Sequence, residues 1–90
     1  MTDPMELEIV NVKGLHARAS AKFVEVVEGF EAQAYVEKDG MRVTGDSIMG
    51  LLMLAASKGT TIMVTCKGPD AEELSQALRA LVADRFGEGM

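Results

Sequence analysis

The chain contains one histidine, His16, and the residues around it are types that bind and carry a phosphoryl group. Gly14 stands two positions before it, Arg18 stands two positions after it, and an apolar-periodic run begins at Ala21. This order predicts a loop, then the histidine, then the start of a helix. The first backbone N–H groups of a helix lack partners and carry a partial positive charge, so such a place favours an anion, above all a phosphate.

The two side chains have complementary chemistry. An imidazole is a nucleophile near neutral pH, because an unperturbed histidine has a pKa of about 6.5. A guanidinium is a planar fork of donors that matches phosphate oxygens. The stretch therefore indicates a histidine that accepts a phosphoryl group, held by Arg18 and by the N–H groups of Ala17 and Arg18. From spacing alone, a lone histidine at a helix start is more often a surface residue or a helix cap.

No second catalytic constellation accompanies this stretch. One histidine and one cysteine cannot build a zinc site of the usual kind, and there is neither a P-loop nor a glycine-rich dinucleotide turn. We therefore expect no metal and no cofactor. Cys66 falls on an inward strand position, so we expect a buried small hydrophobic residue. A lone cysteine allows no internal disulfide, which fits a reducing cytosol.

Length and charge restrict the possible partners. Ninety residues suffice for a single domain, which we expect to span residues 1–90. A net charge of −5 argues against a general nucleic-acid binder. The start is polar and acidic, so we expect no signal peptide. The longest apolar stretch, residues 48–56, is too short to span a bilayer. We expect a cytoplasmic protein.

Hydrophobic periodicity predicts seven elements. Strands are expected at residues 5–12, 31–38, 41–44 and 60–67, because apolar residues alternate there. Helices are expected at residues 17–28, from 48 to about 54, and from 71 to about 86. Strands with one apolar face need cover on one side only, so the order βαββαβα predicts a two-layer α+β open-faced sandwich.

Several boundaries carry their own signals. Asp70 with Glu73 resembles a capping box at the start of the last helix. Ser47 suits the cap position of the short helix at residues 48–54. That helix is apolar nearly all round, so part of it must be core, and we expect Met49 and neighbours such as Leu52 to dock a partner. The last residues, 87–90, are expected to fray.

Two motifs resemble those of a known family. Gly-Leu-His-Ala-Arg-Ala-Ser, residues 14–20, closely resembles the Gly-Leu-His-Ala-Arg-Pro-Ala signature of HPr, the histidine-containing phosphocarriers of the bacterial phosphoenolpyruvate phosphotransferase system. Asp-Ser-Ile-Met-Gly-Leu-Leu-Met-Leu, residues 46–54, resembles the family's regulatory Ser-Ile-Met-Gly segment. Length and element order match as well, so the resemblance covers nearly the whole chain. Ala19 departs from the usual proline, which puts partner preference in doubt. The Ala-Ser after Arg18 looks more like the nitrogen-related or regulatory branch of proteobacteria.

The resemblance implies a fold and a function. The fold is a four-stranded antiparallel sheet of order 1-4-2-3 covered by three helices. The function is that of a carrier without enzymatic activity of its own: His16 accepts a phosphoryl group on Nδ1 from enzyme I, which draws it from phosphoenolpyruvate, and passes it to a histidine of an enzyme IIA-type protein. Ser47 becomes a candidate substrate of an HPr kinase/phosphorylase, which is compatible with its role as a cap. We expect a monomer.

Two other functions remain open at this point. One is a regulator that binds partners through the surface of residues 48–54, switched by phosphorylation of Ser47 while His16 stays idle. The other is a small α+β enzyme similar to an acylphosphatase, in which Arg18 would bind the substrate phosphate. Labelled phosphoenolpyruvate with enzyme I separates the three, since only the carrier gains acid-labile label on His16.

Overall fold

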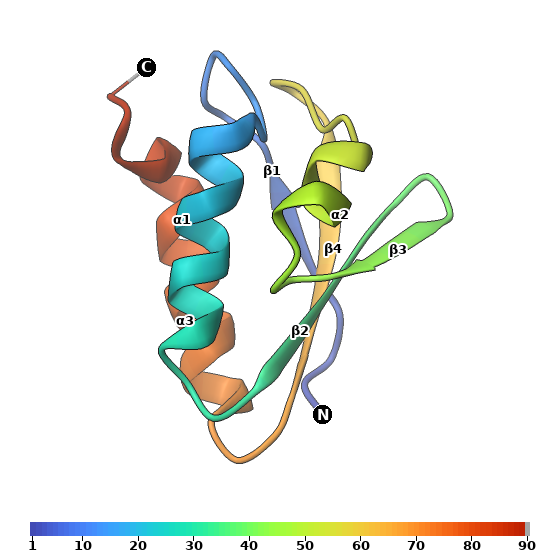
Figure 1. Ribbon diagram of the computed structural model, residues 1–90, viewed down its shortest axis with the longest axis vertical. Helices are drawn as coiled ribbons and strands as arrows, with labels where there is room; N and C mark the ends of the chain where they lie inside the picture. The colour runs from blue at the N-terminus through green and yellow to red at the C-terminus, as the bar shows by residue number, and fades with distance from the viewer. Residues whose placement is uncertain (90) are drawn as a thin grey trace.

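Residues 1–89, which the computed structural model describes, form an antiparallel sheet with helices packed on one side of it (Figure 1). The elements follow the predicted order, with a short 3₁₀ turn added at the end: β1 (Met5–Glu8), α1 (Ala17–Glu28), β2 (Gln33–Lys38), β3 (Met41–Thr44), α2 (Ile48–Met53), β4 (Thr61–Lys67), α3 (Ala71–Ala83) and η1 (Arg85–Gly87).

The sheet has four strands in the order β1-β4-β2-β3, and all three pairings are antiparallel. The expected α+β sandwich and its strand order are therefore confirmed. The register places Val36 opposite both Val64 of β4 and Val43 of β3. Because side chains alternate across a strand, this register turns one apolar row of the sheet toward the helices.

The core lies between the sheet and the helices. Each helix contributes fully buried side chains, such as Phe23 of α1, Leu51 of α2 and Leu74 of α3. Cys66 is also fully buried, as predicted, and this burial raises the pKa of its thiol. No helix in residues 1–89 has the length and apolar character needed to cross a bilayer.

Three strands are shorter than predicted, β4 by the single residue Thr60 and β1 and β2 by more. β1 stops at Glu8, and Ile9 then pairs with the loop before β4, donating to the Thr60 carbonyl at 2.9 Å and accepting from the Gly59 N–H at 2.7 Å. β2 begins at Gln33, because Glu31 exchanges hydrogen bonds with Asp70 and so leaves the ladder.

The predicted capping box at Asp70 is wrong. Asp70 occupies the N-cap position of α3, but its carboxylate makes no capping bond to that helix. It accepts instead from the backbone N–H of Glu31 at 2.9 Å, a residue 39 positions earlier. The side chain therefore ties the segment before β2 to the segment before α3.

Candidate functional site

The loop before His16 is fixed by Gly14 and Leu15. Gly14 has a φ of +66°, and a Cβ there would lie 2.5 Å from the carbonyl oxygen of Ala56, so only glycine fits. Leu15 donates its backbone N–H to that same oxygen at 2.8 Å, and its side chain is buried. The loop is therefore anchored against the segment after α2 immediately before the histidine.

His16 is the N-cap residue of α1, so the prediction that it opens a helix is confirmed. Its backbone carbonyl accepts the N–H of Ser20 at 2.8 Å. Its side chain makes no capping bond, and the N–H groups of Ala17, Arg18 and Ala19 have no acceptor within a helix that starts here. The helix start is thus open to an anion. The imidazole is only partly exposed, at 25% of its side-chain surface.

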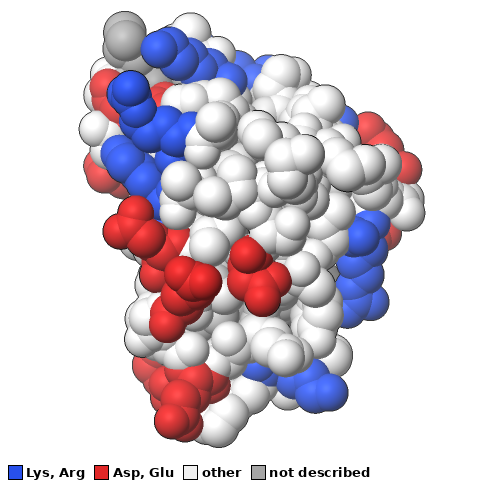
Figure 2. Space-filling model, in the orientation of Figure 1, with Lys and Arg blue, Asp and Glu red and all other residues white. Residues whose placement is uncertain are grey.

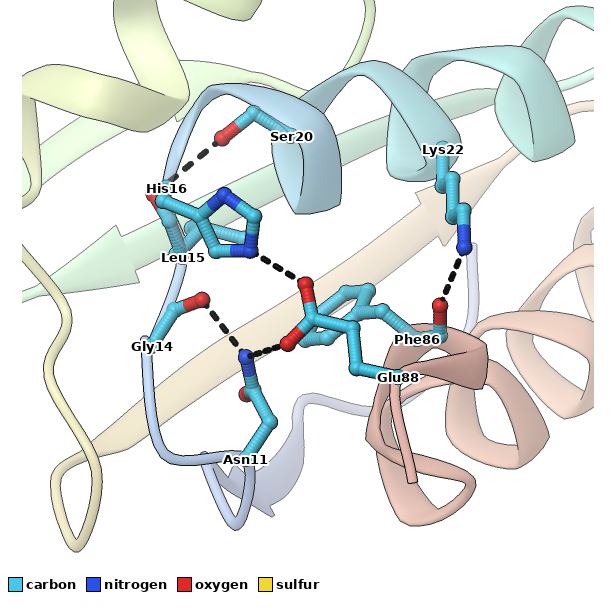
Figure 3. A network of polar contacts seen from close by, with 8 residues as sticks. All are labelled: Asn11, Gly14, Leu15, His16, Ser20, Lys22, Phe86 and Glu88. Carbon is cyan, nitrogen blue, oxygen red and sulfur yellow. Dashed lines mark hydrogen bonds and ion pairs between the residues drawn. The ribbon is translucent and has the colours of Figure 1, made fainter. Parts of the chain in front are cut away.

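A residue that the sequence analysis missed lies against the imidazole. The carboxylate of Glu88 contacts Nε2 of His16 through Oε2 (Figure 3). Its other oxygen, Oε1, accepts a hydrogen bond from Nδ2 of Asn11 at 3.0 Å. The same Asn11 nitrogen donates to the carbonyl of Gly14 at 2.8 Å, so one amide joins the loop to the C-terminal segment.

The predicted fraying of residues 87–90 is wrong for Glu88, which lies in this network, and for Gly87, which ends η1 and donates its N–H to the Asp84 carbonyl at 3.0 Å. Met90 is outside the described residues. The signal that could have found them is Phe86. This aromatic residue follows the apolar stripe of α3 and is fully buried. A buried side chain two positions before Glu88 holds the segment close to α1.

The carboxyl group of Glu88 is stabilised in its charged form. Its partial burial alone would raise the pKa, but hydrogen bonds from Asn11 and His16, together with the positive charges of His16 and Lys13, lower the pKa below its usual value. Glu88 is therefore an anion at neutral pH and an acceptor for both of its partners.

Basic side chains gather beside this network. A pocket of about 270 Å³ is lined by Val12, Lys13, Arg18, Lys22, Gly87 and Glu88. Figure 2 shows lysine and arginine side chains clustered at the upper left, over the start of α1 and the C-terminal segment. Lys22 donates to the carbonyl of Phe86 at 2.6 Å. Arg18 is exposed and takes part in no ion pair within residues 1–89. Its guanidinium is therefore available to a phosphate.

Ser47 is the N-cap of α2, as predicted. Its hydroxyl oxygen accepts the backbone N–H of Gly50 at 3.0 Å. A Cβ on Gly50 would lie 3.1 Å from Cβ of Val43, so the short helix packs closely on β3. The half-buried hydroxyl is thus engaged in the helix start.

α2 presents an apolar surface next to α1, against which it packs. Met49 is 69% exposed and Met53 is 64% exposed, whereas Leu51 between them is fully buried. Figure 2 shows no charged side chains over this helix. The expected exposure of Met49 is confirmed, whereas Leu52 is half-buried. Met53 belongs to the surface of residues 48–54 that the regulator hypothesis uses.

Comparisons with known proteins agree with this architecture. A family model described as "PTS HPr component phosphorylation site" matches residues 5–84. The phosphocarrier protein HPr of Neisseria meningitidis is 49% identical over 83 residues, 92% of this chain and 93% of that protein. The HPr of Cupriavidus necator is 48% identical over 81 residues, 90% of this chain and 91% of that protein. The crystal structure of an HPr from Thermoanaerobacter tengcongensis has a TM-score of 0.93 at 39% identity, covering 99% of this chain and all of that one.

Proposed function

The chain belongs to the HPr family of phosphocarrier proteins, and we propose that His16 is the residue on which it carries the phosphoryl group. HPr proteins carry phosphohistidine in the phosphorelay of the phosphotransferase system and have enzyme I and IIA proteins as partners. One observation supports His16 above all: it is the only histidine in the chain, and it stands at an open helix start.

Nδ1 is the nitrogen that we expect to accept the phosphoryl group. The contact with Glu88 engages Nε2, and the second ring nitrogen lies on the side of the ring away from that carboxylate (Figure 3). An imidazole that carries its proton on Nε2 has a free lone pair on Nδ1. The engaged nitrogen therefore acts as the proton carrier and the other as the nucleophile.

Phosphoryl oxygens on Nδ1 would be held by the first turn of α1. The N–H groups of Ala17 and Arg18 supply donors along the helix dipole, and the Arg18 guanidinium adds a charged fork. A carrier must hold its group without trapping it, because tight binding of the carried state slows the next transfer. A partly exposed site with one free arginine suits that balance.

The apolar surface of α2 beside this basic pocket is our proposed docking surface for both partners. Met49 and Met53 can adapt to different apolar partners, since methionine side chains are flexible. Lys13 and Arg18 make this site locally basic, although the net charge of the chain is −5. A partner with an apolar centre and an acidic rim would match both features.

Ser47 is our candidate for regulation of this docking. It starts the helix that bears Met49, so a phosphate there would lie at the edge of the docking surface. An HPr kinase/phosphorylase would be the modifying enzyme. Regulation of the carrier in this way is simpler than a separate binding protein with an idle His16.

The assignment is tested with labelled phosphoenolpyruvate and enzyme I. We expect one acid-labile phosphoryl group per chain on His16, and none on His16→Ala with an unchanged melting temperature. Full labelling of His16→Ala, with the label mapped elsewhere, would contradict the assignment. An unlabelled parent chain that is modified on Ser47 would favour the regulator. Release of phosphate from an acyl phosphate by this chain alone would favour the small enzyme.

A further inference from the structure

We propose that Glu88 is a positioning residue for His16: its carboxylate holds the Nε2–H of the imidazole and so presents the Nδ1 lone pair to the phosphoryl donor. This inference rests on the proposed role of His16 and adds a residue to it. Glu88 lies beyond residues 5–84, the range over which the family model matches. Its contacts with Asn11 and His16 are features of this chain.

The backbone that delivers Glu88 is held in an unusual conformation. Arg85, Phe86 and Gly87 have φ values of 56°, 53° and 75°, so three successive residues are left-handed. Residues with a Cβ disfavour this region and persist there only where the surrounding structure fixes them. Here the fully buried ring of Phe86 anchors the turn, and the Lys22 ammonium donates to its carbonyl at 2.6 Å. The turn directs Glu88 back toward the start of α1.

The carboxylate is fixed from a second direction by Asn11. This amide is fully buried, and its nitrogen donates both to Oε1 of Glu88 and to the carbonyl of Gly14. An inverted amide would place its oxygen against two other oxygens, so the orientation is set by the network. One oxygen of Glu88 is thus bound to the loop before His16, and the other is left for Nε2.

The contact suits both halves of the transfer. In acceptance, the Nδ1 lone pair forms a bond to phosphorus while the bond from phosphorus to the donor breaks and its electron pair stays with the donor. The proton remains on Nε2, so the ring becomes positively charged beside the Glu88 carboxylate. In delivery, the N–P electron pair returns to Nδ1 and the ring is neutral again. No proton has to leave the imidazole in either direction.

A carboxylate that orients an imidazole and stabilises its cation is an established device in enzymes. Its negative charge could also repel the phosphoryl oxygens. Here Glu88 meets the ring at Nε2, and Lys13, Arg18 and Lys22 line the same pocket as its carboxylate. These cations reduce the repulsion, and the distance between the two ring nitrogens reduces it further.

The experiment compares the parent chain with Glu88→Ala, Glu88→Gln and a matched control, Glu73→Ala, which removes an exposed acid from α3. The ¹⁵N spectrum of the imidazole of the unphosphorylated protein reports which nitrogen bears the proton and how fast that proton exchanges with water. The rate of His16 phosphorylation by enzyme I is measured on the same samples, and melting curves check that each variant is folded.

In the parent and in Glu73→Ala we expect a protected proton on Nε2. In Glu88→Ala we expect faster exchange of that proton, a mixture of tautomers, and phosphorylation slower by about tenfold, the low end of what orienting partners of a reactive imidazole contribute. Glu88→Gln keeps an acceptor oxygen without the charge. It should restore part of the protection and part of the rate.

Two results would overturn the proposal. A faster rate in Glu88→Ala would mean that the carboxylate obstructs the site, and an unchanged spectrum with an unchanged rate would mean that the contact has no role. Failure of the proposed function is a different result: the parent chain would gain no label on His16, while the ¹⁵N spectra would still report whether Glu88 holds the ring.

Discussion

Arg18 is the only arginine that lines the site, and it forms no ion pair with a carboxylate of residues 1–89. It is exposed in the first turn of α1 and lines the pocket beside His16. Its guanidinium can therefore approach a phosphoryl group on Nδ1 without first breaking an ion pair. His16 makes the covalent bond in this scheme, and Arg18 contributes charge and hydrogen bonds only.

Arg18→Ala should slow phosphoryl transfer without abolishing it. Loss of an arginine–phosphate contact at a partly exposed site should remove on the order of 1–3 kcal/mol of transition-state stabilisation, which is a rate lower by roughly 5- to 150-fold. Arg18→Lys keeps the charge but loses the planar fork, so its transfer rate should lie between those of the parent and of Arg18→Ala. Quenched-flow experiments measure the rate of phosphoryl transfer from enzyme I to the chain and the rate of the reverse transfer.

A matched control is Arg42→Ala, which removes the same charge from β3, where the guanidinium stacks 4.5 Å above the Tyr35 ring. Its transfer rate should match the parent. Equal rates in both directions for Arg18→Ala and the parent would contradict the role given to Arg18.

Residue types and spacing indicated His16 and Arg18 as a candidate phosphate site and Ser47 as a helix cap, because each belongs to a local motif at a helix start. The family resemblance supplied the carrier role of His16 and the regulatory role of Ser47. Asn11 and Glu88 could not be predicted in the same way, since their contact joins positions 77 residues apart. The last segment has no periodicity, and its left-handed backbone depends on the burial of Phe86 and the bond from Lys22. Only the fold shows that these residues meet.

α2 fills part of the core with one side and exposes methionine side chains on the other. Its inward side fills the core with Leu51, while Met49 and Met53 remain in solvent. Ser47 begins the helix with a capping bond to Gly50. A helix of only six residues depends on that cap and on packing, because short helices are marginal by themselves.

Met49→Asp should weaken binding to enzyme I and to a IIA protein with little change in melting temperature. The side chain is exposed, so the substitution disturbs the docking surface and leaves the core intact. Calorimetric titration measures the affinity. Met41→Asp places the same change on an exposed position of β3 and should bind as the parent does. A large loss of stability in Met49→Asp would instead make Met49 part of the core.

Phosphorylation of Ser47 should slow phosphorylation of His16 by enzyme I without unfolding the protein. Added negative charge at a helix start is favoured by the dipole, so the helix should hold. Nearly two negative charges beside Met49 must, however, lose water when a partner docks. Phosphoserine and Ser47→Asp proteins are compared with the parent by rate and by melting temperature.

Ser47→Ala separates the cap from the charge. It removes the bond to Gly50 and should lower stability by about 1 kcal/mol while leaving docking unchanged. A lower melting temperature with an unchanged rate in the phosphorylated protein would mean that Ser47 is only a structural cap.

Element types followed from local periodicity, but some element ends did not. β2 loses its first two predicted residues because Glu31 pairs with Asp70 across the fold. The same bond removes the carboxylate of Asp70 from its expected capping role. Both differences have one cause, a tertiary hydrogen bond that overrides the local preference of each segment.

The order of the strands in the sheet could not be predicted from the hydrophobic pattern. Four strands with one apolar face each can pair in several orders while burying the same side chains. The order β1-β4-β2-β3 came from the family resemblance and is what the structure has. In this fold the segment before α1 lies beside Glu88, so residues from the first and last parts of the described chain form one site (Figure 1).

This closure by the C-terminal segment predicts a pH dependence of stability. The pKa of Glu88 is lower in the folded protein than its ordinary value of 4.5, because the bonds from Asn11 and His16 and the charges of His16 and Lys13 outweigh its partial burial. The unfolded chain therefore takes up this proton first as the pH falls. The contribution of Glu88 to stability is fully present at pH values above the ordinary pKa of the carboxyl, and it is lost as the pH falls through the pKa of the folded protein.

We expect the free energy of unfolding of the parent to fall more steeply with decreasing pH, from about pH 5 downward, than that of Glu88→Gln, which has no proton to bind there. Urea unfolding at a series of pH values measures both curves. Glu73→Gln removes an exposed acid of α3 and should keep the slope of the parent. Parallel curves for the parent and Glu88→Gln would show that the side-chain carboxylate of Glu88 is not bound to the start of α1 in solution.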